Sequence, residues 1–148
     1  MKDIITAALL TRKIEYGDYD FILTFFTRDF GKITAMANNA RKSVKRFSGT
    51  LELFMEMEIR FRHGKKRNDM IYLMETDLYH PHVYIRYDYL KSAYASFFSE
   101  IYNHWFEENN KQETLFLLLK YILDLLDTGT MPPSELSILF LIKFLDKS

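Results

Sequence analysis

The sequence predicts an α+β fold, in which a five-stranded β-barrel is followed by a small helical region. Up to about residue 80, short runs rich in Phe, Ile and Thr alternate with turns that contain Gly and Asp. Beyond that point, apolar side chains recur at spacings of three and four, which is typical of amphipathic helices. The pair His80-Pro81 marks the change. We therefore expect one domain over residues 1–80 and a second over 81–148.

The first three strands are expected to follow one another closely. Residues from Ile4 to Ile14 form a plausible strand, and Tyr16–Asp20 is predicted to turn the chain because it contains Gly and Asp. Phe21–Arg28 is rich in Phe, Ile and Thr, which favours a second strand. Asp29–Gly31 then turns the chain again, and Lys32–Ala37 forms the third strand.

The clearest strand pattern covers residues 51–61. Apolar side chains alternate there with polar ones, so one face should be buried and the other, with Glu52, Glu56 and Glu58, should be wet. A polar hairpin loop is expected over His63–Asp69, and Met70–Leu78 forms the last strand. Five short strands in about 80 residues fit a small closed or nearly closed barrel.

Three helices are expected in the second region. The first runs onward from Tyr84, and the second covers Glu113–Leu126 after a loop at 107–111. The segment Met131–Ser134 introduces the third helix, since proline is acceptable at a helix start. This last helix is apolar nearly all round, which predicts burial on more than one side. The apolar face of the first helix would carry Leu90, Tyr94, Phe97, Ile101 and Trp105.

The composition excludes several classes of protein. The chain has no cysteine, so disulfides and thiolate metal sites are excluded and a reducing compartment is expected. The N-terminus lacks a signal-peptide pattern, and no run approaches the roughly 20 apolar residues that a membrane span needs. We therefore expect a soluble, cytoplasmic protein that does not act in a membrane.

The net charge of zero hides an uneven distribution of charge. Residues 1–80 carry 14 Lys and Arg against 11 Asp and Glu, whereas residues 81–148 carry 6 against 9. The strongest concentration is the basic loop, which we define as residues 41–47 and which holds Arg41, Lys42, Lys45, Arg46 and Phe47. Phosphates attract such cations, and the aromatic ring beside them can stack on a base. The alternative is a solvated loop that Phe47 anchors in the core.

Other basic residues are weaker candidates for contacts with nucleic acid. Lys65, Lys66 and Arg67 lie at the tip of the predicted hairpin, where they form either a second phosphate contact or a solubilising turn. A further group could line a groove of the barrel, although strand parity alone does not establish this. That group comprises Arg12, Arg28, Lys32, Arg60 and Arg62.

Patterns for catalysis or metal binding are weak. His80 and His82 are close in sequence, but a zinc site needs three or four ligands and cysteine is missing. The sequence has no Gly-rich phosphate loop and no arrangement that indicates a nucleophile with its base. We therefore predict a protein that is not an enzyme and that has no metal site and no cofactor.

A series of short motifs runs through residues 8–54 in a characteristic order and spacing. The motifs are Tyr16-Gly17-Asp18-Tyr19-Asp20, Ile22–Thr27, Gly31-Lys32-Ile33, Ala37–Ser43, Arg46-Phe47-Ser48-Gly49 and Leu51–Phe54. In their order and spacing the chain resembles RecO, a family of recombination mediator proteins. Two positions depart from the family pattern, because Asn38 and Asn39 replace its usual Lys-Gly. Asparagine tolerates the left-handed backbone conformation, so the turn itself can survive.

The resemblance implies an N-terminal OB-fold, a C-terminal helical domain and a protein of the nucleoid that acts by binding. It implies binding of single- and double-stranded DNA and annealing of complementary strands. It also implies help in loading a RecA-type recombinase onto strands coated by single-stranded-DNA-binding protein, with RecR as a partner. Members of the family usually run longer, and many have a cysteine zinc site that this chain lacks. Two alternatives stay open: an adaptor whose basic loop binds an acidic peptide tail, and an OB-fold that binds RNA.

Overall fold

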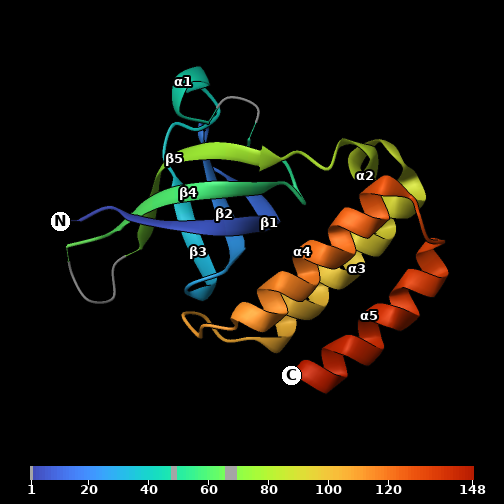
Figure 1. Ribbon diagram of the computed structural model, residues 1–148. Helices are drawn as coiled ribbons and strands as arrows, with labels where there is room; N and C mark the ends of the chain where they lie inside the picture. Colours follow the sequence, from blue (N-terminus) through green and yellow to red (C-terminus); the bar gives the residue numbers. More distant parts are fainter. Residues whose placement is uncertain (1, 48–49, 66–69) are drawn as a thin grey trace.

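A computed structural model describes residues 2–47, 50–65 and 70–148 of the chain (Figure 1). The described part forms a closed barrel of five strands with the long helices packed to one side of it (Figure 1). The strand order is β1-β2-β3-β5-β4, in which β3 and β5 are parallel and the other pairs are antiparallel. This confirms the predicted α+β class with an N-terminal OB-fold barrel. The strands are β1 (Ile4–Tyr16), β2 (Asp20–Thr27), β3 (Gly31–Ala37), β4 (Glu56–His63) and β5 (Ile71–His80).

The barrel closes because β1 is long enough to pair on both sides. Its first half, Ile4 to Leu9, pairs with β4, and the stretch from Ala8 to Tyr16 pairs with β2. The register shifts between Leu10 and Arg12, as expected where a strand bends between two partners. Inward-facing side chains fill the barrel, among them Leu10, Leu23, Phe25, Ile33, Ile59 and Phe61.

The segment expected to be one strand over residues 51–61 divides into two parts. Strand β4 begins only at Glu56, because the chain turns at Phe54, which has a positive φ of 71°. Backbone hydrogen bonds tie this turn to β1, with Phe54 N donating to Leu10 O (2.8 Å) and Leu10 N donating to Met55 O (3.1 Å). The predicted wet face is therefore wrong at Glu56, which is 4% exposed. Glu52 and Glu58 are exposed as predicted.

A short helix that was not expected, α1 (Val44–Phe47), lies inside the basic loop. The remaining helices are α2 (Val83–Tyr87), α3 (Tyr89–Trp105), α4 (Glu113–Thr128) and α5 (Pro133–Lys147). The first predicted helix is broken at Asp88, whose side chain accepts a hydrogen bond from Lys91 N and caps α3.

The buried faces of the outer helices differ from those predicted. Helix α3 buries Ala95, Phe98 and Tyr102, whereas Leu90, Phe97 and Trp105 of the expected apolar face are exposed. Both faces of this helix are apolar, so packing against α4 and α5 decides between them. Helix α5 buries one side only, and its exposed apolar side chains correct the expectation of burial all round. They are Ile138, Leu141, Ile142 and Leu145.

A second apolar cluster, distinct from the one inside the barrel, joins the barrel to the helices. Leu9, Phe26 and Phe54 of the barrel belong to the same cluster as Tyr102 and Phe116 of the helices. The Phe26 ring meets the Tyr102 ring edge to face, with centroids 4.8 Å apart. The two regions are thus packed together through buried aromatic side chains. Of the helices in the described part of the chain, none combines the length and apolar character that crossing a membrane requires.

Candidate nucleic-acid interface

The basic loop is built on a tight turn at the end of β3. Asn39 adopts the left-handed conformation, with a φ of 56°, which agrees with the tolerance expected of asparagine there. Its carbonyl accepts hydrogen bonds from the backbone N–H groups of Lys42 (3.1 Å) and Ser43 (3.0 Å). The chain is thereby directed into the short helix α1, which carries Lys45 and Arg46.

The turn between β1 and β2 holds the basic loop in place. Arg41 N donates to Tyr19 O (2.9 Å), and Asn39 N donates to an Asp20 carboxylate oxygen (2.8 Å). The Arg41 guanidinium also donates to Asp18 O (2.9 Å). The turn and the loop therefore form one surface at the end of the barrel where α1 is labelled in Figure 1.

The cations of this surface are only partly balanced by nearby acids. Arg41 lies 3.9 Å from a Glu15 carboxylate oxygen, and Lys42 Nζ lies 3.7 Å from the centroid of the Tyr19 ring. Arg46 donates to Asn38 O, while Lys45 is exposed. Three acidic residues therefore lie near the four basic ones: Glu15, Asp18 and Asp20. The local excess of positive charge is smaller than the basic loop alone suggests.

The ring of Phe47 does not reach the surface. Its side chain is 4% exposed and belongs to the core cluster of the barrel, with the Arg46 guanidinium 4.6 Å from its ring centroid. A base cannot stack on a buried ring, so the structure agrees with the alternative in which Phe47 anchors the loop. Two exposed rings lie in the turn instead: Tyr16, 54% exposed, and Tyr19, 43% exposed. The sequence signal for them is the Tyr-Gly-Asp-Tyr-Asp motif, which predicts a turn and supports the family resemblance but does not by itself indicate exposed rings.

Arg28 and Lys32 do not join the basic loop. They lie at the β2–β3 turn, at the opposite end of β3, where Lys32 Nζ donates to Asn103 O (2.8 Å) and ties the barrel to α3. Arg28 is exposed and contacts Asp29 at 3.3 Å. Hydrogen bonds from Arg28 and from Thr6 hold the pKa of Asp29 below its ordinary value.

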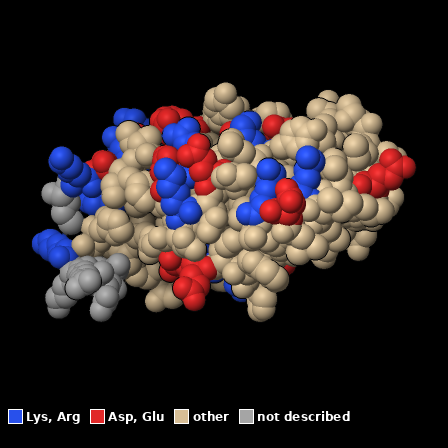
Figure 2. All heavy atoms as spheres, turned by 60° about the horizontal axis from the view of Figure 1, so that its bottom comes forward, with Lys and Arg blue, Asp and Glu red and all other residues tan. Residues whose placement is uncertain are grey.

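The remaining basic candidates are scattered over the barrel. Lys65 is exposed, whereas Lys66 and Arg67 fall outside the described residues. Arg12 is exposed, and both Arg60 and Arg62 form ion pairs with Asp3 on the barrel wall. The face drawn in Figure 2 shows basic and acidic side chains interspersed, without a continuous basic stripe. Among the described residues, the basic loop with its adjoining turn is thus the most concentrated set of cations beside exposed rings.

Comparisons with known proteins agree on one family. Residues 1–82 match the family described as "Recombination protein O N terminal", and residues 86–148 match "Recombination protein O C terminal". A protein named DNA repair protein RecO from Desulfatibacillum aliphaticivorans is 45% identical over 98% of this chain and 56% of its own length. The protein of the same name from Desulfosudis oleivorans is 42% identical over the same shares. That from Syntrophus aciditrophicus is 34% identical over 84% of this chain and 48% of its own length. The chain spans about half the length of these curated relatives.

Proposed function

Because the chain belongs to the RecO family of DNA repair proteins, we propose that it binds DNA and anneals complementary strands as a recombination mediator. In this role it helps a recombinase to load onto strands coated by single-stranded-DNA-binding protein, and RecR is its partner. It acts by binding, without a catalytic step, on DNA of the nucleoid in the cytoplasm. We also propose that residues 1–80 form the DNA-binding domain and that residues 81–148 form part of a helical domain.

The observation that supports DNA binding most directly is the joining of the basic loop to the β1–β2 turn. A backbone hydrogen bond from Arg41 to Tyr19 fixes the loop with its four cations against the turn, where the rings of Tyr16 and Tyr19 are exposed. Cations that neutralise phosphates release counterions, and exposed rings stack on bases of any sequence. Such a surface favours nucleic acid with little sequence preference. Neutralising phosphates also lowers the repulsion between two strands and so lets them pair.

The test is the affinity for a fluorescent single-stranded oligonucleotide across a salt series. A slope of about −2 or steeper in log affinity against log salt corresponds to roughly three phosphates on a single strand. Replacing Arg41, Lys42, Lys45 and Arg46 by Ala should weaken binding strongly and flatten this slope. The matched control replaces Lys2, Lys111, Lys143 and Lys147, which removes the same charge at sites away from the basic loop. Equal losses in the two variants would refute a localised site.

A second candidate function, a protein–protein adaptor, is favoured by an apolar groove between α3 and α5. The groove has a volume of about 390 Å³ and is lined mainly by apolar side chains, among them Phe97, Ile101, Trp105, Leu141 and Leu145. Exposed apolar surface of this kind often contacts another protein. In the adaptor the basic loop binds an acidic peptide. Normal DNA affinity of the variant without the four basic-loop cations, together with loss of an acidic peptide ligand, would favour this function.

A further inference from the structure

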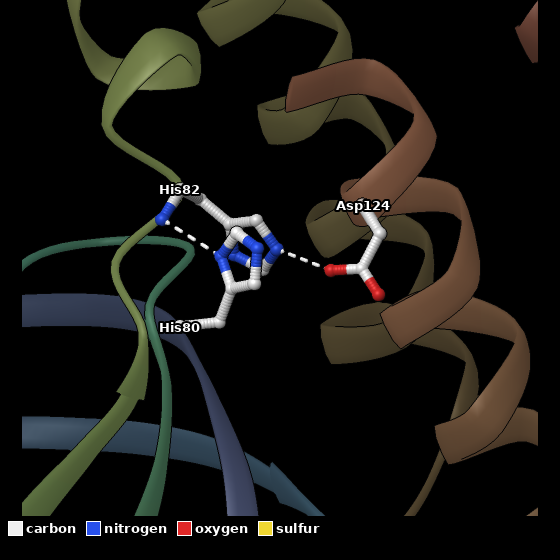
Figure 3. Close-up of side chains that lie close together, drawn as sticks. All are labelled: His80, His82 and Asp124. Atoms are coloured by element: carbon white, nitrogen blue, oxygen red, sulfur yellow. Dashed lines mark hydrogen bonds and ion pairs between the residues drawn. The ribbon is translucent and has the colours of Figure 1, made fainter. Parts of the chain in front are cut away.

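Two histidines that are close in sequence meet a distant carboxylate where β5 leads into α2. His80 and His82 come from this junction and Asp124 comes from α4 (Figure 3). The two imidazole rings stack with centroids 4.2 Å apart, and one ligand atom from each of the three residues lies within 4.8 Å of the others. His82 is fully buried, whereas His80 and Asp124 are half-buried, so water can reach the cluster from one side.

The orientation of His82 is determined by a backbone carbonyl. Its Nδ1 lies 2.6 Å from Phe54 O, and since a carbonyl only accepts, Nδ1 must carry the hydrogen. This leaves Nε2 directed at Asp124 Oδ1, 2.7 Å away. A histidine whose other ring nitrogen donates to a backbone carbonyl has the arrangement that metal-ligating histidines commonly show.

The two residues joined by the hydrogen bond from His82 Nδ1 to Phe54 O both have an unusual backbone conformation. Phe54 has a φ of 71° and His82 a φ of 49°, and neither residue is glycine. Left-handed conformations of bulky residues persist only where the surroundings enforce them, and they gather at ligand sites. The strain lies mainly at Phe54, whose carbonyl orients the imidazole, because histidine tolerates the left-handed conformation better than phenylalanine.

The nearest cation, Lys120, contacts only one of the two carboxylate oxygens of Asp124. Lys120 lies 3.5 Å from Asp124 Oδ2 and 3.2 Å from Glu56 Oε1, so it occupies the oxygen of Asp124 that faces away from His82. Glu56 is buried and offsets the charge of Lys120. The other oxygen of Asp124, Oδ1, is free of Lys120 and accepts the hydrogen of His82 Nε2.

We propose that His80, His82 and Asp124 bind a divalent transition-metal ion, Zn²⁺ foremost, that connects the end of the barrel to α4. Imidazole and carboxylate are ligands that Zn²⁺ accepts, and three protein ligands with a water in the fourth position form a common zinc geometry. The ion replaces the hydrogen between His82 Nε2 and Asp124, so that binding releases a proton. His80 must bring one ring nitrogen closer to the other two ligand atoms, because atoms bound tetrahedrally at about 2 Å lie about 3.3 Å apart.

The test titrates the purified chain, with any affinity tag removed, with Co²⁺ and follows visible absorption; Zn²⁺ then competes for the site. We expect one ion per chain and a melting temperature that rises with Zn²⁺, because the ion binds the folded state. His80→Ala and Asp124→Asn should each weaken binding at least about tenfold. Asparagine retains an oxygen that can accept from His82, and His80→Ala leaves the His82–Asp124 hydrogen bond in place, so both variants should fold. His63→Ala and His104→Ala remove exposed histidines and serve as controls.

Two results would overturn the proposal. One is a folded wild-type chain that shows neither a Co²⁺ absorption band nor a Zn²⁺-dependent melting temperature. The other is unchanged affinity in His80→Ala and Asp124→Asn, which would mean that the ion binds adventitiously elsewhere. No DNA is present in these experiments, so their outcome is independent of the proposed DNA binding.

Discussion

One methyl group added at Gly31 should damage the packing of the barrel against the helices. Gly31 opens β3 with a φ of +67°, and a Cβ built there would lie 2.0 Å from Asn110 O, a backbone atom. The neighbouring contacts belong to the same junction: Asn109 N donates to Lys32 O (2.9 Å), and Lys32 Nζ donates to Asn103 O (2.8 Å). Gly31→Ala therefore strains its own backbone and also pushes residues 109–110 away from β3.

The variant Gly17→Ala serves as a control that separates backbone strain from the steric clash with Asn110. The φ of Gly17 is +63°, nearly that of Gly31, but a Cβ there meets nothing within 4 Å. Gly17→Ala should cost only the conformational penalty, about 1 kcal/mol. Gly31→Ala should cost this amount plus the loss of the junction contacts, of which each hydrogen bond is worth about 1 kcal/mol, giving roughly 3 kcal/mol in total.

Urea unfolding followed by circular dichroism measures both free energies of unfolding. The midpoint should fall in both variants and about three times further for Gly31→Ala, while the slope m stays unchanged. In thermal unfolding, each kcal/mol should lower the melting temperature by about 2–4 °C for a chain of this size. Equal losses in the two variants would show that the close approach of Asn110 contributes nothing, and the reasoning would fail.

The other predictions concern the interface and the acid stability of the barrel. Replacing both Tyr16 and Tyr19 by Ala should weaken binding to a single-stranded oligonucleotide, by about 1–3 kcal/mol for each stacked base, with little change in unfolding; unchanged affinity would remove the rings from the site. Phe47→Leu should instead lower the free energy of unfolding by about 1 kcal/mol and leave the oligonucleotide affinity of the folded protein unaltered; a loss of affinity without a loss of stability would contradict its core role. The pKa of Asp29 is depressed in the folded state, so its ionised form stabilises the fold above about pH 4, and this contribution is lost as pH falls through the folded pKa. Asp29→Asn should therefore make unfolding by urea less dependent on pH in that acid range, and an unchanged pH profile would count against the role of the Arg28 and Thr6 hydrogen bonds.

Much of the local structure could be predicted from periodicity. The alternation Met57, Ile59, Phe61 identifies the buried face of β4, and the spacing of Leu115, Leu119 and Ile122 identifies that of α4. Such patterns follow from the geometry of a strand or helix with one buried side, which needs no knowledge of the partner. The turn motifs can also be predicted from the sequence, because few residue types can occupy a position with a positive φ.

The failures share a different cause. Alternation continues through Phe54 in the sequence, but hydrogen bonds to Leu10 in β1 bend the chain there, and α4 then covers Glu56. Helix α3 has apolar residues on both faces, so its own sequence does not say which face the other helices bury. In each case the outcome depends on segments that are distant along the chain.

The candidate sites divide in the same way. The composition of the basic loop and the turn chemistry at Asn39 can be predicted from the local sequence, because both depend on neighbours in the chain. The packed fold was needed to establish that Phe47 points inward, that Tyr19 lies beside Lys42, and that Asp124 reaches His82. Burial, charge pairing and the meeting of distant side chains are properties of the packed molecule, since each requires contacts that local periodicity does not encode.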